Sequence, residues 1–497
     1  MEKPDTKHPA HLKRALNPMH VWALAFGCII GWGSFINPSK KFLFNSGVAG
    51  TAIAMLLGAA IMVVIAFNYA YMVPKYPKAG GQFTFAKICF GRLPAFLCGW
   101  FLVAAYLTNV PMNSTAIGLI IDGLFGPILK FGFHYTVAGF DIYAGEMLFA
   151  MAVLVLFGLF NIQGVKVAGS IQTVLAFLLG SSVLTLTAIA LTSDAATFAN
   201  MEPLWGFDKE TAVSALRAGS YDGIEPFVHT GTVSICAAVL ATLAIAPWAY
   251  VGFDTIPQAA EEYKFSPTKV SFIMIVAISF GCFVYIANNT ITAAALANWP
   301  DLIINSSHTP WLLLAASERL LGVFGKVIVG IAVFSAVLTG IMGFYMASSR
   351  LMYSMARDGY LPESFAVIDP KHRTPKNALL FCIGISLSGP ILGREALGWF
   401  VDMCAIGASI GFLFTCLATR VTMKKNGESN SFLSIVSVLG AAFSAFFIAL
   451  QLIPIPGLDF VHFGTPSYLL LVVWILIGAA FYPVSYTHLT LPTNSRV

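Results

Sequence analysis

The sequence has little charge. Only 10% of its 497 residues are Asp, Glu, Lys or Arg, whereas 58% are hydrophobic. A soluble domain carries roughly 25% charged residues, so this chain has too few to cover a water-facing surface along its length. Apolar stretches of about 20 residues, the length of a helix that crosses a bilayer, recur from end to end. We therefore expect an all-α polytopic protein embedded in the lipid bilayer.

Several functional signatures are also missing. The eight cysteines stand apart, without a CxxC pair or a Cys/His cluster, which argues against a zinc site or a disulfide framework. No basic run is interleaved with aromatic residues, so nucleic acid is not an expected partner. The first apolar run lacks a small-residue cleavage site, which favours a retained helix over a removed signal peptide. The apolar spans contain no Ser/His/Asp set and no metal-ligand pattern, so we expect neither an enzyme nor a cofactor.

Hydropathy divides the chain into about twelve candidate transmembrane spans. They cover residues 21–36, 47–73, 93–121, 144–160, 169–192, 234–258, 271–297, 322–349, 378–393, 396–418, 431–452 and 467–484.

The distribution of Lys and Arg predicts the orientation of these spans. Short cytoplasmic loops collect the positive charges. With the N-terminal segment 1–20 inside, 19 positive residues lie on the cytoplasmic side and 8 on the outer side. This bias predicts a multi-pass protein of the cell inner (plasma) membrane with both termini in the cytoplasm.

Two segments outside the spans need separate interpretations. Residues 193–233 form an acidic and aromatic outer loop, either an ordered cap over an outer vestibule or a plain solvated loop. Residues 485–497 differ abruptly from the preceding apolar span. They resemble translated sequencing-adapter read-through, so we expect a non-native tail without function.

Two spans, the first and the sixth, are interrupted by glycine and proline. In the first, Gly31 and Gly33 break the apolar run, and in the sixth Pro247, Gly252 and Pro257 do so. These residues weaken the helical hydrogen-bond ladder, and in a bilayer the freed groups must find partners or line a wet cavity. Close packing of helices through small residues is the alternative interpretation of the two glycines in span one.

Interrupted helices five spans apart are typical of inverted repeats. Spans one to five (21–192) and six to ten (234–418) would form the repeats, with two appended helices in 431–484. Free N–H groups at half-helix N-termini suit an anion, and free carbonyls at half-helix C-termini suit an ammonium or Na⁺. A zwitterionic amino acid uses both kinds of group.

Short stretches in a fixed order support this interpretation. They are 30–35 (IGWGSF), 77–83 (PKAGGQF), 161–166 (NIQGVK), 252–254 (GFD), 259–262 (AAEE), 349–351 (SRL), 356–359 (ARDG), 361–362 (LP) and 374–375 (TP). As a set, the sequence resembles the amino acid–polyamine–organocation (APC) permeases over residues 20–420. The resemblance implies the leucine-transporter-like fold, with two inverted five-helix repeats and the substrate near the midplane.

The resemblance also implies a binding site. Backbone amides around Gly31, Gly33 and Ser34 would take a substrate carboxylate. Trp248 would occupy the position of the family's aromatic outer gate. An amine would be taken by backbone carbonyls, namely those near Ile29 and Ile30 and those at Trp248, Ala249 and Val251, the last beside Gly252.

Two carboxylates well inside the spans qualify as functional candidates, because charge is costly there. Asp254 follows the break in span six, where it is either a proton-coupling group or a cap of the second half-helix. Asp402 in span ten more simply makes a structural hydrogen bond to a neighbouring helix. On the cytoplasmic side, Glu261 and Glu262 with Arg357 form either an inner-gate ion-pair network or a solvated face.

One departure from the family bears on coupling. Many members carry a lysine in span five, in place of which this chain has Leu179. Three options follow: Na⁺ held by span-one carbonyls and a hydroxyl such as that of Thr339, H⁺ on Asp254, or no coupling ion. The Thr339 hydroxyl could equally bond back to its own helix.

These features predict a secondary active transporter that moves an amino acid or a small amine by alternating access. The span-six stretch 252–258 (GFDTIPQ) resembles that of some amine permeases, so an amine without a carboxylate stays open. The alternative is a membrane nutrient sensor that binds the same ligands without moving them.

Overall fold

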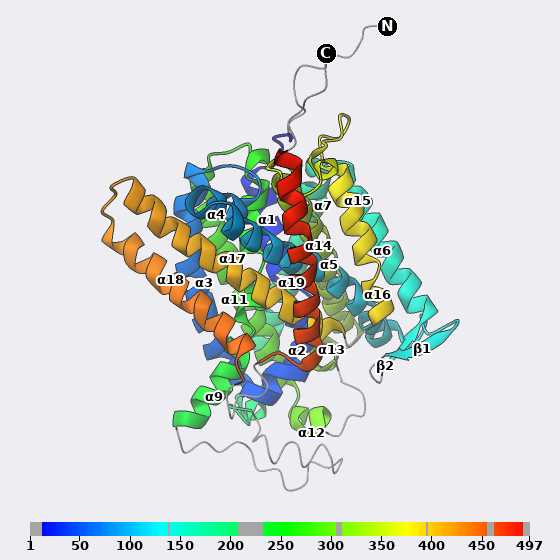
Figure 1. Cartoon of the computed structure of the whole chain (residues 1–497). Coiled ribbons are helices and arrows are strands. Elements are labelled where there is room, and N and C mark those ends of the chain that lie inside the picture. Colours follow the sequence, from blue (N-terminus) through cyan, green and yellow to red (C-terminus); the bar gives the residue numbers. More distant parts are fainter. Residues whose placement is uncertain are drawn as a thin grey trace.

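Long apolar helices pack side by side through the molecule (Figure 1). The computed structural model describes residues 12–137, 140–206, 232–304, 311–393, 396–454 and 462–490. Within these ranges, nine helices are long and apolar enough to cross a membrane. They are α3 (Leu43–Lys75), α5 (Arg92–Phe125), α6 (Ala144–Ile162), α7 (Val165–Thr192), α11 (Val270–Ala295), α14 (Val323–Arg357), α17 (Ala396–Lys425), α18 (Ser431–Leu452) and α19 (Thr465–Thr490).

The sixth predicted span is a bent helix pair. It consists of α9 (Thr232–Leu243), α10 (Ala246–Tyr250) and the 3-10 helix η3 (Phe253–Glu262). Between the segments Ile235–Leu243 and Ala246–Glu262 the axis bends by 44°. If this pair counts as one span, the described residues contain ten.

The first and ninth predicted spans are divided into shorter helices. The first consists of α1 (Pro18–Ile29), α2 (Gly33–Asn37) and a π-helical turn (Pro38–Phe42), and the ninth of α15 (Lys376–Ser386) and α16 (Gly389–Leu392). A helix the length of α1 extends about 18 Å, less than the ~30 Å hydrocarbon core. The total of twelve transmembrane spans therefore remains a prediction.

The remaining elements are short and connect the long helices. They are α4 (Gly81–Phe90), α12 (Trp299–Ile304), α13 (Leu312–Leu321), the 3-10 turns at Phe198–Met201, Pro267–Lys269 and Glu363–Ala366, and an antiparallel hairpin of β1 (His134–Val137) and β2 (Phe140–Tyr143). The all-α prediction is thus confirmed apart from this hairpin. The hairpin lies at the opposite end of the bundle from α4 (Figure 1).

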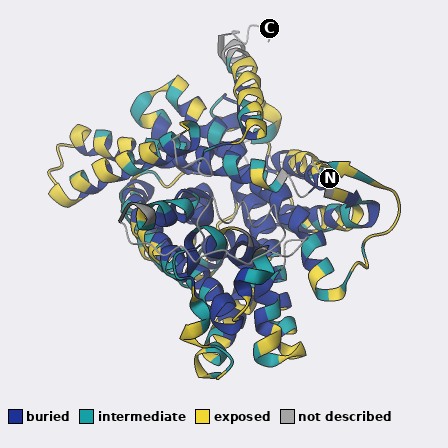
Figure 2. Ribbon diagram, turned by 90° about the horizontal axis from the view of Figure 1, so that it is seen from below, coloured by how far each residue is buried: buried dark blue, intermediate teal, exposed yellow. Residues whose placement is uncertain are grey.

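The outer surface of the bundle is apolar. Exposed residues lie around the periphery of the bundle, and buried ones fill its interior (Figure 2). Large side chains that are mostly exposed occur on several long helices, including Leu56, Leu148, Val174, Phe272, Ile435 and Leu469. Soluble proteins seldom expose such large apolar surfaces, so lipid is the solvent that suits this periphery.

Part of the outer loop is packed against the bundle. The Ala294 carbonyl at the end of α11 accepts bonds from the N–H of Thr197 (3.0 Å) and the side chain of Asn200 (2.7 Å). The Ala49 N–H donates to the Leu204 carbonyl at 2.9 Å. Residues 193–206 therefore lie over the ends of α3 and α11, as the cap interpretation expects, whereas 207–231 fall outside the described residues.

The last helix is longer than expected. α19 continues to Thr490, beyond the predicted end at residue 484. The backbone is therefore helical into the segment predicted as a non-native tail. Residues 491–497 lie outside the described range, and the origin of the tail stays a prediction.

A buried ion pair joins α14 to the end of η3. The Arg350 guanidinium donates to both carboxylate oxygens of Glu262, at 3.3 and 3.1 Å, and both side chains are fully buried. The Glu262 carbonyl also accepts the N–H groups of Ala15 and Leu16, just before α1. A second pair, between Arg357 and Glu261 (2.9 Å), is partly exposed. These four charged residues therefore include one buried pair and do not form a solvated face alone.

We expect Arg350→Met to lower the free energy of unfolding by about 3–5 kcal/mol, because it leaves the Glu262 carboxylate buried without a counter-charge. Thermal unfolding of the purified protein in detergent measures the change. The matched control, Arg357→Met, removes a partly exposed pair and should cost about 1 kcal/mol or less. The double variant Arg350→Met/Glu262→Met should recover much of the loss. Equal losses in the two single variants would contradict this account.

Candidate functional site

Both predicted helix interruptions are present. α1 ends at Ile29, and Ile30 (φ −92°, ψ 86°) leaves the helical conformation before α2 begins. In the sixth span, Val251 (ψ 131°) is extended, and Gly252 has a φ of 141°. An L side chain rarely adopts that φ, so glycine is required at this second break.

The two breaks contact each other. A Cβ atom placed on Gly252 would lie 2.6 Å from the backbone nitrogen of Ile29, which leaves no room for a side chain. A Cβ atom on Gly33 would lie 2.3 Å from Cη2 of Trp248. The rings of Trp32 and Trp248 are 6.3 Å apart between centroids. The structure therefore brings together the residues that the sequence predicted for the site.

The first break leaves backbone donors free. Within the described residues, the N–H groups of Gly31, Trp32 and Gly33 have no hydrogen-bond acceptor. The Ser34 amide is already used, because both its N–H (3.2 Å) and its hydroxyl (3.0 Å) donate to the Gly31 carbonyl. Of the amides predicted to take a carboxylate, those around Gly31 and Gly33 are available and that of Ser34 is engaged.

The predicted carbonyls also divide into two groups. The Ile29 carbonyl accepts from the Tyr285 hydroxyl at 3.3 Å, and the Trp248 carbonyl accepts from the Val251 N–H at 3.2 Å. The carbonyls of Ile30, Ala249 and Val251 accept no hydrogen bond from any described residue. These three are free to accept from a ligand.

Thr339 of α14 lies beside α1, the N-terminal half of the broken first span. Its hydroxyl is 3.1 Å from the Gly27 carbonyl on α1. It is also 2.8 Å from the carbonyl of Ser335 on its own helix. The hydroxyl has a single proton, so the contact to α1 and back-bonding within α14 compete.

Asp254 is fully buried and has only uncharged hydrogen-bond donors around it. Its Oδ2 accepts from the Tyr106 hydroxyl (2.7 Å) and from Nε2 of Gln82 (3.2 Å), and its Oδ1 accepts from the Gly252 N–H (2.9 Å). The Gln258 amide in turn donates to Oε1 of Gln82 at 2.6 Å. The carboxylate therefore joins η3 to α4 and α5, in addition to bonding backward to the break.

The two side-chain partners of Asp254 differ in how far they could be predicted from the sequence. Gln82 belongs to the stretch 77–83 (PKAGGQF) that carries the family resemblance, so that motif could have indicated it. Tyr106 is one polar ring in an apolar span and carried no signal. Asp402 makes the expected structural bond, since it accepts from the Ser467 hydroxyl of α19 at 2.6 Å.

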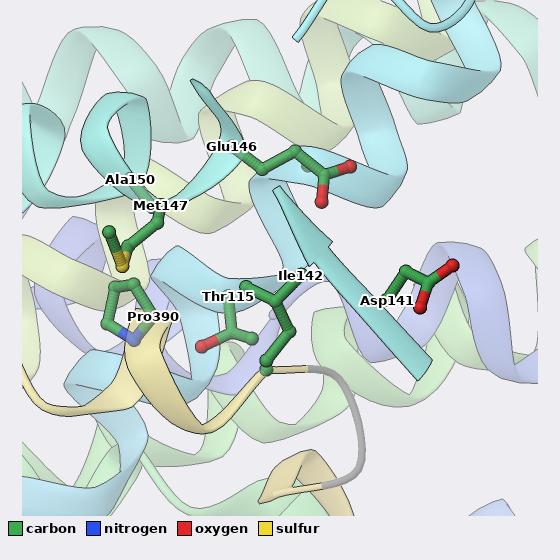
Figure 3. Close-up of a pocket in the computed structure, with 9 residues that line it drawn as sticks. Thr115, Asp141, Ile142, Glu146, Met147, Ala150 and Pro390 are labelled. Atoms are coloured by element: carbon green, nitrogen blue, oxygen red, sulfur yellow. The ribbon is translucent and has the colours of Figure 1, made fainter. Parts of the chain in front are cut away.

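A small hollow near the β-hairpin is a rival location (Figure 3). Glu146 and Asp141 lie on one side of it, and Met147 and Pro390 lie on the opposite side. The Asp141 carboxylate already accepts from the Thr136 hydroxyl at 2.7 Å. None of the described residues that line the hollow is basic, so these residues offer no counter-charge to a substrate carboxylate, and the paired breaks are the stronger candidate.

Comparison with known proteins shows the family of this chain. The amino acid permease family model matches residues 16–480. The chain is similar to the methylthioribose transporter of Bacillus subtilis, with 24% identity over 95% of this chain and 93% of that protein. It is also similar to the human Asc-type amino acid transporter 1 (25% identity; 95% and 84% covered) and to a B. subtilis branched-chain amino acid permease (25%; 95% and 92%). The chain therefore belongs to the amino acid permease family of the APC superfamily, and it is a multi-pass membrane transporter and not an enzyme.

Proposed function

We propose that this transporter carries an amino acid across the cell inner (plasma) membrane by alternating access, with the paired breaks as the substrate site. The observation that carries the proposal is the presence of free donors and free acceptors side by side. The N–H groups of Gly31, Trp32 and Gly33 adjoin a second break in which the carbonyls of Ala249 and Val251 are free. An α-amino acid presents one carboxylate and one ammonium within a single carbon of each other, so it can occupy both sets.

The positions of the helix ends add an electrostatic reason. The free N–H groups lie at the start of α2, where the helix dipole favours negative charge. The free carbonyl of Ile30 lies just past the end of α1, where the dipole favours positive charge. A zwitterion oriented between these two ends is stabilised at both of its charges.

A small amine without a carboxylate fits less well, because it would leave the three N–H groups of the first break without an acceptor. Two of the relatives described above are named as amino acid transporters, which also favours an amino acid. The name of the third refers to methylthioribose, so family membership alone does not determine the substrate.

Asp254 is the proposed coupling group. It is a buried carboxylate next to the break, and its donors are neutral, so ionisation there is not compensated by a positive charge. Binding a proton would remove that cost, and losing it would restore the charge beside the substrate site. A Na⁺ ion held by α1 carbonyls and Thr339 is the second option, and transport without a coupling ion is the third.

The orientation of the chain is part of the proposal. The loop positive charges place both termini in the cytoplasm, and residues 21–192 and 234–418 would then be repeats of opposite orientation. The first and sixth spans, which are interrupted in the structure, occupy corresponding positions in these two segments.

The transport function is tested with purified protein in liposomes. We expect saturable uptake of at least one of the twenty labelled L-amino acids. An inwardly directed proton gradient (acidic outside) should stimulate this uptake, and Na⁺ should have no effect on it. Empty liposomes and heat-unfolded protein are the controls. Saturable binding without flux for every amino acid would instead support a sensor, and the absence of binding would refute the proposal.

Gly33→Val should abolish uptake while the protein still inserts and folds. The new side chain would begin 2.3 Å from Trp248 Cη2 and would fill the space in front of the free amides. Gly384→Val is the matched control, because Gly384 of α15 has no atom within 4 Å of its added Cβ. Initial uptake rates of both variants measure transport, and their size-exclusion profiles measure whether they are folded. Uptake by Gly33→Val at the wild-type rate would rule out the site.

Asp254→Asn should leave uptake insensitive to an imposed pH gradient, because the asparagine cannot gain or lose the coupling proton. The Gly252 N–H can still donate to an amide oxygen at the Oδ1 position, and the amide nitrogen at the Oδ2 position can donate to the Tyr106 hydroxyl, which favours retention of the fold. Asp402→Asn serves as the control, since Asp402 bonds to Ser467 away from the break, and its pH profile should match that of the wild type. A pH profile of Asp254→Asn that is unchanged from the wild type would exclude the proton role.

A further inference from the structure

A buried side-chain oxygen near the first break, Oδ1 of Asn113, has no hydrogen-bond partner among the described residues. α5 carries Asn109 and Asn113 one turn apart, and both are 2% exposed. The Asn113 amide nitrogen donates to the Asn109 carbonyl at 2.8 Å. Its oxygen, Oδ1, has no hydrogen-bond donor among the described residues. Leaving such a buried acceptor unsatisfied costs about 1–3 kcal/mol.

The orientation of this amide follows from its surroundings. If the nitrogen and oxygen were exchanged, an oxygen would face the Asn109 carbonyl oxygen, and two acceptors would oppose each other. The hydrogen-bonding pattern therefore places the nitrogen toward Asn109 and leaves the oxygen free.

The free oxygen lies at the substrate site. A Cβ atom placed on Gly31 would have one neighbour within 4 Å, and this neighbour is Oδ1 of Asn113 at 3.7 Å. On the other side, a Cβ atom on Gly340 of α14 would lie 2.9 Å from the same oxygen. Glycine at both positions leaves room for the amide, which lies between the break and α14.

Asn113 adds what the backbone donors of the first break lack. The N–H groups of Gly31 to Gly33 recognise a negative group, and a neutral amide oxygen next to them recognises a donor. An ammonium has three N–H donors and can bond to Oδ1 while the adjoining carboxylate bonds to the backbone. Asn161 of α6 also has a free oxygen, but its amide nitrogen contacts the Phe157 and Met342 carbonyls, away from the break.

We propose that Oδ1 of Asn113 accepts a hydrogen bond from the substrate ammonium, and that Asn113 thereby selects α-amino acids over carboxylic acids that lack the amine. This inference rests on the proposed function, because it assigns one contact within the same substrate site.

The test uses the amino acid that the wild-type protein takes up fastest, together with its deaminated analogue (propionate for alanine, 4-methylpentanoate for leucine). Asn113→Leu should raise the KM for the amino acid about 10- to 100-fold, the range expected for loss of a hydrogen bond to a charged group. The affinity of the analogue, measured by competition, should change little. Discrimination between the two ligands should therefore fall by the same factor.

Asn161→Leu is the matched control. It removes a buried asparagine with an equally free oxygen, whose amide nitrogen also donates to the backbone carbonyl four residues earlier and in addition contacts that of Met342, so it should change stability without changing discrimination. Asn113→Asp keeps an acceptor oxygen at the site and should still prefer the amino acid. Direct binding of the labelled amino acid in detergent provides a readout that does not depend on transport.

The outcomes separate the two proposals. If the wild-type protein neither binds nor transports any amino acid, the proposed function fails. If it does so, and Asn113→Leu discriminates between the amino acid and its analogue as well as Asn161→Leu does, the assignment of Asn113 is overturned.

Discussion

The structure depends on one constraint, namely that a peptide group inside a bilayer must have a hydrogen-bond partner or face a polar site. Most of the long helices satisfy their backbone internally. The first and sixth spans do not, because Ile30 and Gly252 leave the helical conformation in the middle of otherwise apolar sequence. The two defects face each other inside the bundle, so the unpaired groups are directed away from lipid.

Close approach of helices makes this arrangement possible. A Cβ atom on Gly343 would lie 2.2 Å from Sγ of Cys28, and one on Gly281 would lie 2.5 Å from Cγ2 of Ile29. Glycines on α14 and α11 therefore let α1 pack against both helices immediately before its break. The Tyr285 hydroxyl on α11 then bonds to the Ile29 carbonyl. In the first span, Gly33 also packs closely, because its added Cβ atom would lie 2.3 Å from Trp248, so close packing and a helix break are complementary interpretations of that glycine.

The charged groups of the interior are placed according to their partners. Arg350 and Glu262 are buried together, so each neutralises the other between α14 and η3. Asp254 is buried with a hydroxyl, an amide and a backbone N–H as its donors. A buried pair of opposite charges is suited to holding helices together, whereas a buried carboxylate with neutral donors is suited to taking up a proton. This difference distinguishes the Arg350–Glu262 pair from the proposed coupling group.

The sequence by itself determined the membrane setting, the helical class, the family and the two breaks, because low charge, apolar run length, glycine and proline act locally along the chain. It also predicted Gly31, Gly33 and Asp254 as site residues from motifs that carry the resemblance, and Trp248 from its position four residues before Gly252. Tertiary structure decided which groups are free. Only packing shows that the Ile29 carbonyl is engaged by Tyr285, and that Tyr106 donates to Asp254. The free oxygen of Asn113 likewise depends on Gly31 and Gly340, two glycines far apart in the chain. Hydrogen-bond partners from distant helices leave no periodic pattern in a sequence, and for that reason they could not be predicted from it.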